Sequence, residues 1–147
     1  MKSKMRKVKK KINMGRIRKN IEVSGKQFWT LFDTGSRNTY VIKKVAEGFG
    51  ISEISNPRKV SLGGKVHSLK NVFLLHAKVE GYPVEIDSYI IDEIGYDEDK
   101  KNIEILFGTL AMQKWGIRPV PDEEILDMSN YSEEFVEFIE ITNAKIK

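Results

Sequence analysis

Residues 28–36 read Phe28-Trp29-Thr30-Leu31-Phe32-Asp33-Thr34-Gly35-Ser36. An almost wholly apolar strand, expected over residues 27–32, runs directly into the ionisable side chain of Asp33. Burying a carboxylate without a partner costs free energy, so an acid in this place needs an explanation. Gly35 allows a close backbone turn, and the hydroxyls of Thr34 and Ser36 can satisfy nearby polar groups. The same residues also suit an ordinary strand-ending turn, so this segment alone leaves a structural and a chemical interpretation open.

Two further segments help to decide between the structural and the chemical interpretation. An apolar strand expected over residues 103–107 ends at Gly108, which lies 75 positions after Asp33. Thr109 is then expected to cap a short helix that runs through Trp115 and stops at Gly116. Between the two segments, residues 62–66 place a Gly-Gly pair between strand-like arms, which predicts a hairpin.

In order and spacing, the three segments resemble those of the retropepsin-like aspartic proteases, over residues 14–128. The resemblance implies a mostly β, single-lobe acid protease fold, with a closed, barrel-like sheet, a flap hairpin and one short helix. Asp33 would be the catalytic carboxylate, on a loop supported by Thr34, Gly35 and Ser36. The flap would touch the substrate through Leu62, Gly63, Gly64, Lys65 and Val66. A second motif, Leu106, Phe107 and Gly108, would thread past the Asp33 loop and support it.

One position departs from the family pattern. Many family members carry Asp or Arg soon after the Gly of the second motif, where this chain has Thr109. That position is not the catalytic carboxylate, so the departure leaves peptide hydrolysis possible.

The number of catalytic motifs predicts the oligomeric state. Aspartic proteases need two carboxylates that share one proton, and Asp-Thr-Gly occurs once in this chain. A second copy related by two-fold symmetry would supply the other carboxylate, so we expect a homodimer acting on a peptide or protein substrate. In the family, the motif Thr contacts its counterpart across the axis, a role that Thr34 would inherit. The alternative is a non-catalytic dimeric peptide-binding module with the same fold.

Composition narrows the remaining classes of function. The chain has 147 residues, enough for one domain, and no cysteine, which excludes disulfides and thiolate chemistry. His67 and His76 lack metal-ligand spacing with nearby acids, so we expect no metal and no cofactor. No apolar run is long enough to span a bilayer, and the basic N-terminus lacks the apolar stretch of a secretory signal. We therefore expect a cytoplasmic protein without a membrane partner.

The N-terminal part of the chain is strongly basic, whereas the rest is mildly acidic. Residues 1–20 hold ten basic and no acidic side chains, whereas the remaining 127 residues hold 15 basic and 21 acidic ones. Residues 1–13 are expected to form a disordered tail, either a tether to nucleic acid or acidic surfaces or a solubilising leader upstream of a true start at Met14. Nucleic-acid binding is expected only through that tail. Residues 129–147 follow the domain as a predicted amphipathic helix, with Phe135, Phe138 and Ile139 at helical spacing.

Overall fold

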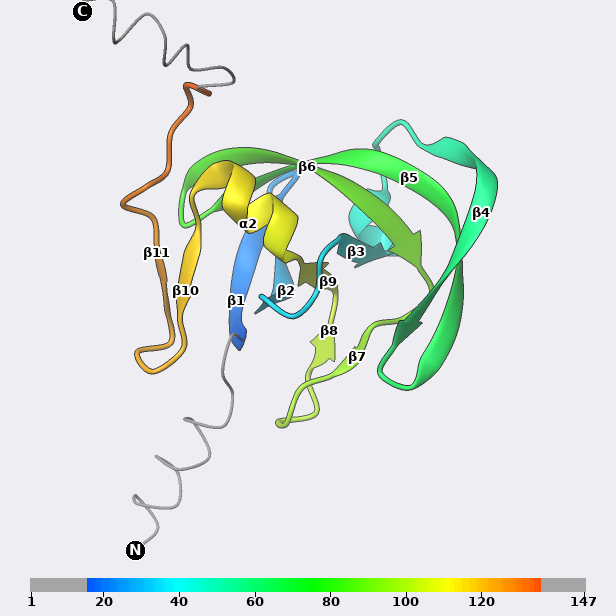
Figure 1. Ribbon diagram of the computed structural model, residues 1–147, viewed down its shortest axis with the longest axis horizontal. Coiled ribbons are helices and arrows are strands. Elements are labelled where there is room, and N and C mark those ends of the chain that lie inside the picture. Colours follow the sequence, from blue (N-terminus) through cyan, green and yellow to red (C-terminus); the bar gives the residue numbers. More distant parts are fainter. Residues whose placement is uncertain (1–15, 136–147) are drawn as a thin grey trace, which may run out of the picture.

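A computed structural model describes residues 16–135, which form a mostly β structure with one short α-helix (Figure 1). The predicted basic tail, residues 1–13, lies outside the described residues. The strands are, in chain order, β1 (Arg16–Val23), β2 (Lys26–Asp33), β3 (Thr39–Ile42), β4 (Ser52–Leu62), β5 (Lys65–Val79), β6 (Tyr82–Ile91), β7 (Gly95–Tyr96), β8 (Asn102–Ile103), β9 (Ile105–Phe107), β10 (Arg118–Val120) and β11 (Ile125–Asp127). The helices are the 3-10 turn η1 (Lys43–Ala46) and the α-helix α2 (Thr109–Trp115).

Seven strands form one sheet in the order β1-β2-β9-β3-β6-β5-β4. Its pairings are mixed: β2 with β9 and β3 with β6 are parallel, and the neighbouring pairs are antiparallel. The sheet curls until β1 also meets β5, at the single pair Glu22–Lys78. One pair does not establish a closed barrel, so complete closure of the sheet stays a prediction.

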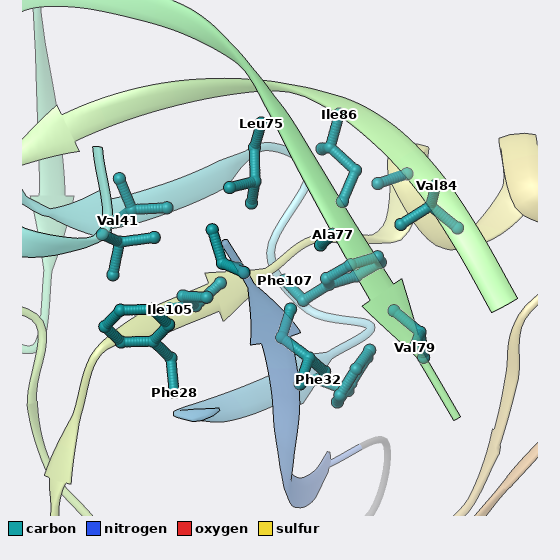
Figure 2. Packing of buried hydrophobic residues seen from close by; sticks show 14 of the residues in the cluster. Phe28, Phe32, Val41, Leu75, Ala77, Val79, Val84, Ile86, Ile105 and Phe107 are labelled. Carbon is teal, nitrogen blue, oxygen red and sulfur yellow. The ribbon is translucent and has the colours of Figure 1, made fainter. Parts of the chain in front are cut away.

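The core lies inside this curl. Phe28 and Phe32 of β2 alternate with half-buried neighbours, because successive side chains of a strand point to opposite faces. Figure 2 shows them converging with side chains of β3, β5, β6 and β9. Ile105 and Phe107 of the short β9 are fully buried, and the Phe32 and Phe107 rings lie 4.6 Å apart between centroids. Burial on this scale, roughly 1.5–3 kcal/mol for each large apolar side chain, holds the end of β2 in place.

Several predicted elements need correction. The hairpin predicted around residues 62–66 is much longer than that segment, because β4 and β5 have 11 and 15 residues. β4 is mostly exposed and polar, so it shows no apolar pattern that would reveal a strand. The two-residue strand β7 pairs with β8, and neither β7 nor this pairing is among the predicted elements. Helix α2 has the predicted bounds, but its N-cap is Gly108 and Thr109 is its first helical residue.

The C-terminal region continues the domain beyond residue 128. A hairpin of β10 and β11, absent from the predicted elements, leads to Tyr131, whose hydroxyl donates a hydrogen bond to the carbonyl of Pro83 at 2.6 Å. The Tyr131 ring also stacks on Trp115, with centroids 5.9 Å apart. Residues 129–135 are not helical, and the rest of the predicted C-terminal helix lies outside the described residues. No helix within residues 16–135 is long and apolar enough to cross a membrane.

The contact between Gly116 and the C-terminal segment gives a stability test. Gly116 has a φ of 68°, and a Cβ there would lie 2.2 Å from the carbonyl oxygen of Asn130. We expect Gly116→Ala to lower the free energy of unfolding by at least about 1 kcal/mol, because the left-handed conformation alone costs an L-residue that much. Chemical denaturation measures the difference.

Gly50→Ala is the matched control. A Cβ at Gly50 would meet nothing within 4 Å, and the backbone there does not require glycine. Its unfolding free energy should stay within about 0.5 kcal/mol of the parent. Equal losses in the two variants would contradict the packing of residue 130 against the end of α2.

Candidate active site

Asp33 is the last residue of β2 and lies between two neighbouring strands. It is opposite Arg16 of β1, while the preceding Phe32 is opposite Phe107 of β9. The Asp33 side chain is 17% exposed, so it reaches solvent from a strand end that is otherwise packed. Its Oδ1 accepts a hydrogen bond from the main-chain N–H of Gly35 at 2.8 Å. A Cβ at position 35 would lie 3.1 Å from that oxygen, so glycine leaves the room this turn needs.

The loop after Asp33 is joined to the start of α2. Ser36 and Arg37 offer their carbonyl oxygens to the N–H groups of Thr109 and Leu110, at 2.6 and 3.1 Å. The N–H of Gly108 donates to Thr39 Oγ1 at 3.0 Å. These three bonds connect the second half of the loop and the start of β3 to one helix terminus. The predicted second motif therefore lies directly against the loop that carries Asp33.

A groove of about 460 Å³ brings the predicted segments together. It is lined by Asp33, Gly35 and Ser36 of the loop, Leu62 and Gly63 of the hairpin, and Leu106 of the second motif. Other predicted residues lie outside it. Phe107 is in the core, Gly108 lies beneath the loop, and Thr34, Gly64, Lys65 and Val66 do not line the groove. Lys65 instead forms an ion pair with Glu93.

Two arginines near Asp33 are absent from the predicted site. Arg16 Nε lies 3.4 Å from Asp33 Oδ2, and both Arg16 and Arg37 line the groove. The position of Arg16 beside Asp33 can be predicted from the sequence. Ser24-Gly25 forms a two-residue turn with positive φ at both positions, and counting back equally along both strands places Arg16 opposite Asp33.

Asp97 fixes the loop that borders one side of the groove. Its carboxylate accepts hydrogen bonds from the Trp29 indole at 2.8 Å and from the N–H groups of Asp99 and Lys101, both at 2.9 Å. Burial alone would raise the pKa of Asp97, but these bonds stabilise the charged form and hold the pKa below its usual value. The loop that these bonds fix also carries Tyr96, which lines the groove. A second cavity of about 530 Å³ adjoins here, and its charged lining residues are Arg16, Arg18, Asp97, Glu98, Asp99 and Glu124.

The histidines stay apart from the groove. His67 and His76 do not line it, and His76 stacks on Phe49 with centroids 6.1 Å apart. Within residues 16–135, no group of three or more His, Asp or Glu side chains is placed to hold a metal ion.

Comparisons with known proteins give a structural likeness and no sequence relative. No protein-family model matches the chain, and no curated protein matches it. The retroviral protease-like domain of Ddi1 from Leishmania major superposes with a TM-score of 0.57 at 12% identity, over 80% of this chain and 91% of that domain. A foamy viral protease-reverse transcriptase bound to an RNA/DNA hybrid matches with a TM-score of 0.48 at 15% identity, over 72% of this chain and 13% of the viral one. The likeness to the Leishmania domain shows a retropepsin-like fold over about four fifths of the chain.

Proposed function

We propose that this protein is an aspartic endopeptidase that acts as a homodimer, each protomer contributing Asp33. The observation that carries the proposal is the groove in which Asp33, at the end of a buried strand, faces the same space as Leu62 and Gly63. A retropepsin-like fold supports it, because each lobe of that fold presents one such carboxylate. The substrate would be an extended stretch of peptide or protein lying in the groove.

The chemistry follows from two carboxylates that share one proton. The ionised Asp33 takes a proton from water as the water oxygen attacks the scissile carbonyl carbon. The protonated Asp33 of the other protomer gives its proton to the carbonyl oxygen, which produces a neutral tetrahedral diol. The diol then collapses: the Asp33 that took the proton from water gives it to the nitrogen, the other, now ionised, Asp33 takes a hydroxyl proton, and the C–N bond breaks. The Gly35 N–H, 2.8 Å from Oδ1, stabilises the charged form of one oxygen and orients the carboxylate.

The other predicted residues take supporting roles in this proposal. Thr34, exposed on the loop, would meet its counterpart across the two-fold axis. Residues 62–66 form the tip of the β4–β5 hairpin and would close over the bound peptide, excluding water from the reaction. Leu106, Phe107 and Gly108 would hold the Asp33 loop from beneath through the hydrogen bonds and ring contact at its base.

One observation favours a second candidate, a non-catalytic peptide-binding module. Arg16 lies 3.4 Å from the Asp33 carboxylate, and an arginine so placed neutralises the charge that a partner's carboxylate would meet. In that case Asp33 would be held as a structural ion pair, and the groove would bind peptides without cleaving them. In the protease, by contrast, dimer formation would move the Arg16 side chain, which is 56% exposed, away from Asp33.

Asp33→Asn separates the two candidates. Asparagine has nearly the same size and can still accept the Gly35 hydrogen bond, but it cannot act as a base. We expect peptide turnover to fall by at least about 100-fold, with the melting temperature and the dimer preserved. Asp122→Asn, at an exposed position outside the groove, is the control and should keep parental turnover. Full turnover by Asp33→Asn would overturn the catalytic assignment, and unfolding of the variant would make Asp33 a structural turn residue.

Activity should depend on the concentration of the protein. Because each active site needs two copies of Asp33, we expect sedimentation to show a monomer–dimer equilibrium and specific activity to rise with the dimer fraction. Analytical ultracentrifugation and peptide turnover, measured over the same range of concentrations, test this. A chain that stays monomeric throughout and still cleaves peptides would contradict the shared site.

The hairpin tip should change its dynamics on binding. Gly63 and Gly64 both have positive φ and carry no side chain to pack, so the tip is held only by the strand pairing beside it, by the packing of Leu62 and by the exposed Lys65–Glu93 ion pair. We expect hydrogen exchange of these amides to slow when a peptide inhibitor is bound, while amides of the buried β9 stay protected in both states. Strong and equal protection of residues 62–66 with and without the inhibitor would argue against a flap.

A further inference from the structure

The charges that line the groove differ from those of the rest of the domain. Residues 16–135 carry 16 basic and 19 acidic side chains, a net charge of −3. In the groove the balance is reversed, because Arg16 and Arg37 line it and Asp33 is its one acid. A positive groove in an acidic domain indicates the charge of what binds there, since complementary charges favour the matching partner.

Arg37 is the stronger determinant of the two. Arg16 is already partnered by Asp33 at 3.4 Å, whereas Arg37 enters no ion pair within the described chain, residues 16–135. Its main chain is fixed, because its carbonyl accepts the N–H of Leu110 at 3.1 Å. Arg37 is exposed and lines the groove together with Asp33, and it also borders another cavity, of about 270 Å³, whose lining includes Glu85 and Asp87. A fixed backbone thus presents an uncompensated guanidinium four residues from the candidate catalytic carboxylate.

We infer that the groove selects peptides with an acidic side chain, Asp or Glu, close to the position that Asp33 faces, and that Arg37 is the specificity-determining residue. A guanidinium binds a carboxylate through two parallel N–H donors, which gives both direction and charge selection. The preference should be confined to the subsites near Arg37. The adjoining cavity is lined by four acids, Asp97, Glu98, Asp99 and Glu124, against two arginines, so its net negative charge disfavours acids placed further along the peptide. This inference rests on the proposed function for its peptide ligand.

Binding and cleavage should be measured separately. Peptides with a randomised central segment are made in series that fix Glu, Gln or Lys at one position at a time. Binding of each series to Asp33→Asn is followed by fluorescence anisotropy, and cleavage of each series is followed with the parent protein. At one or more positions we expect Glu to be preferred over Lys by at least about five-fold, the factor that corresponds to about 1 kcal/mol for an accessible ion pair. The preference should shrink as ionic strength rises, because salt screens exposed charges.

Reversing the charge of Arg37 tests whether this residue causes the preference for Glu. Arg37→Glu, also made in the Asp33→Asn background, should reverse the order so that Lys series bind better than Glu series. Lys26→Glu is the matched control, since it makes the same change of charge at an exposed position that does not line the groove. It should leave the preference for Glu unchanged.

The outcomes distinguish the two levels of the proposal. Binding that favours Glu through Arg37 without any cleavage would support this inference and overturn the protease. Cleavage and binding that ignore the sign of the charge at every position would overturn the inference and leave the protease standing. An acidic preference that survives Arg37→Glu, or that Lys26→Glu removes equally, would also overturn the assignment to Arg37.

Discussion

Gly108 meets the loop that follows Asp33 more closely than a residue with a Cβ can. A Cβ at this position would lie 2.2 Å from the carbonyl oxygen of Asn38 and 2.6 Å from that of Arg37. The approach lets three main-chain N–H groups at the start of α2 bond to the loop, from Ser36 to Thr39. The direction of the Asp33 carboxylate, the position of Arg37 and the base of the groove all depend on this contact. Backbone packed on backbone gives a rigid support, because neither side contributes a flexible side chain.

The sequence predicts the parts of the fold that carry an apolar pattern or a glycine signal. β2, β9 and α2 follow from apolar runs and from Gly108 and Gly116, which mark the ends of elements. β4 does not, because most of its side chains are exposed, and its pairing with β5 is a tertiary effect that local propensity does not record. The β10–β11 hairpin is also hidden, since each strand has three residues and Pro119 lies in the first.

The residues of the candidate site also fall into those that the sequence predicts and those that it does not. Asp33 and Gly35 attract attention because an acid ends an apolar strand, and Leu62 and Leu106 enter only through the family resemblance. No periodicity brings residues 33, 62 and 106 to one groove, because that requires parallel pairing of β2 with β9 and the long reach of β4 and β5. The position of Arg16 beside Asp33 follows from the register of the β1–β2 hairpin. Arg37 has no local signal at all, since its importance comes from the charges around it in the folded domain.

The turn at Ser24-Gly25 has a consequence for how this fold can diverge. Side chains of a strand alternate between faces, so one residue inserted there would move Ile17 and Ile21 from the core to the solvent. The same shift would carry Arg16 past Asp33 and leave another side chain beside the carboxylate. The turn between β10 and β11 has no such link to the groove's charge. Changes in length should therefore accumulate over evolution at the turn between β10 and β11, while the two-residue turn keeps its length even where its residues vary.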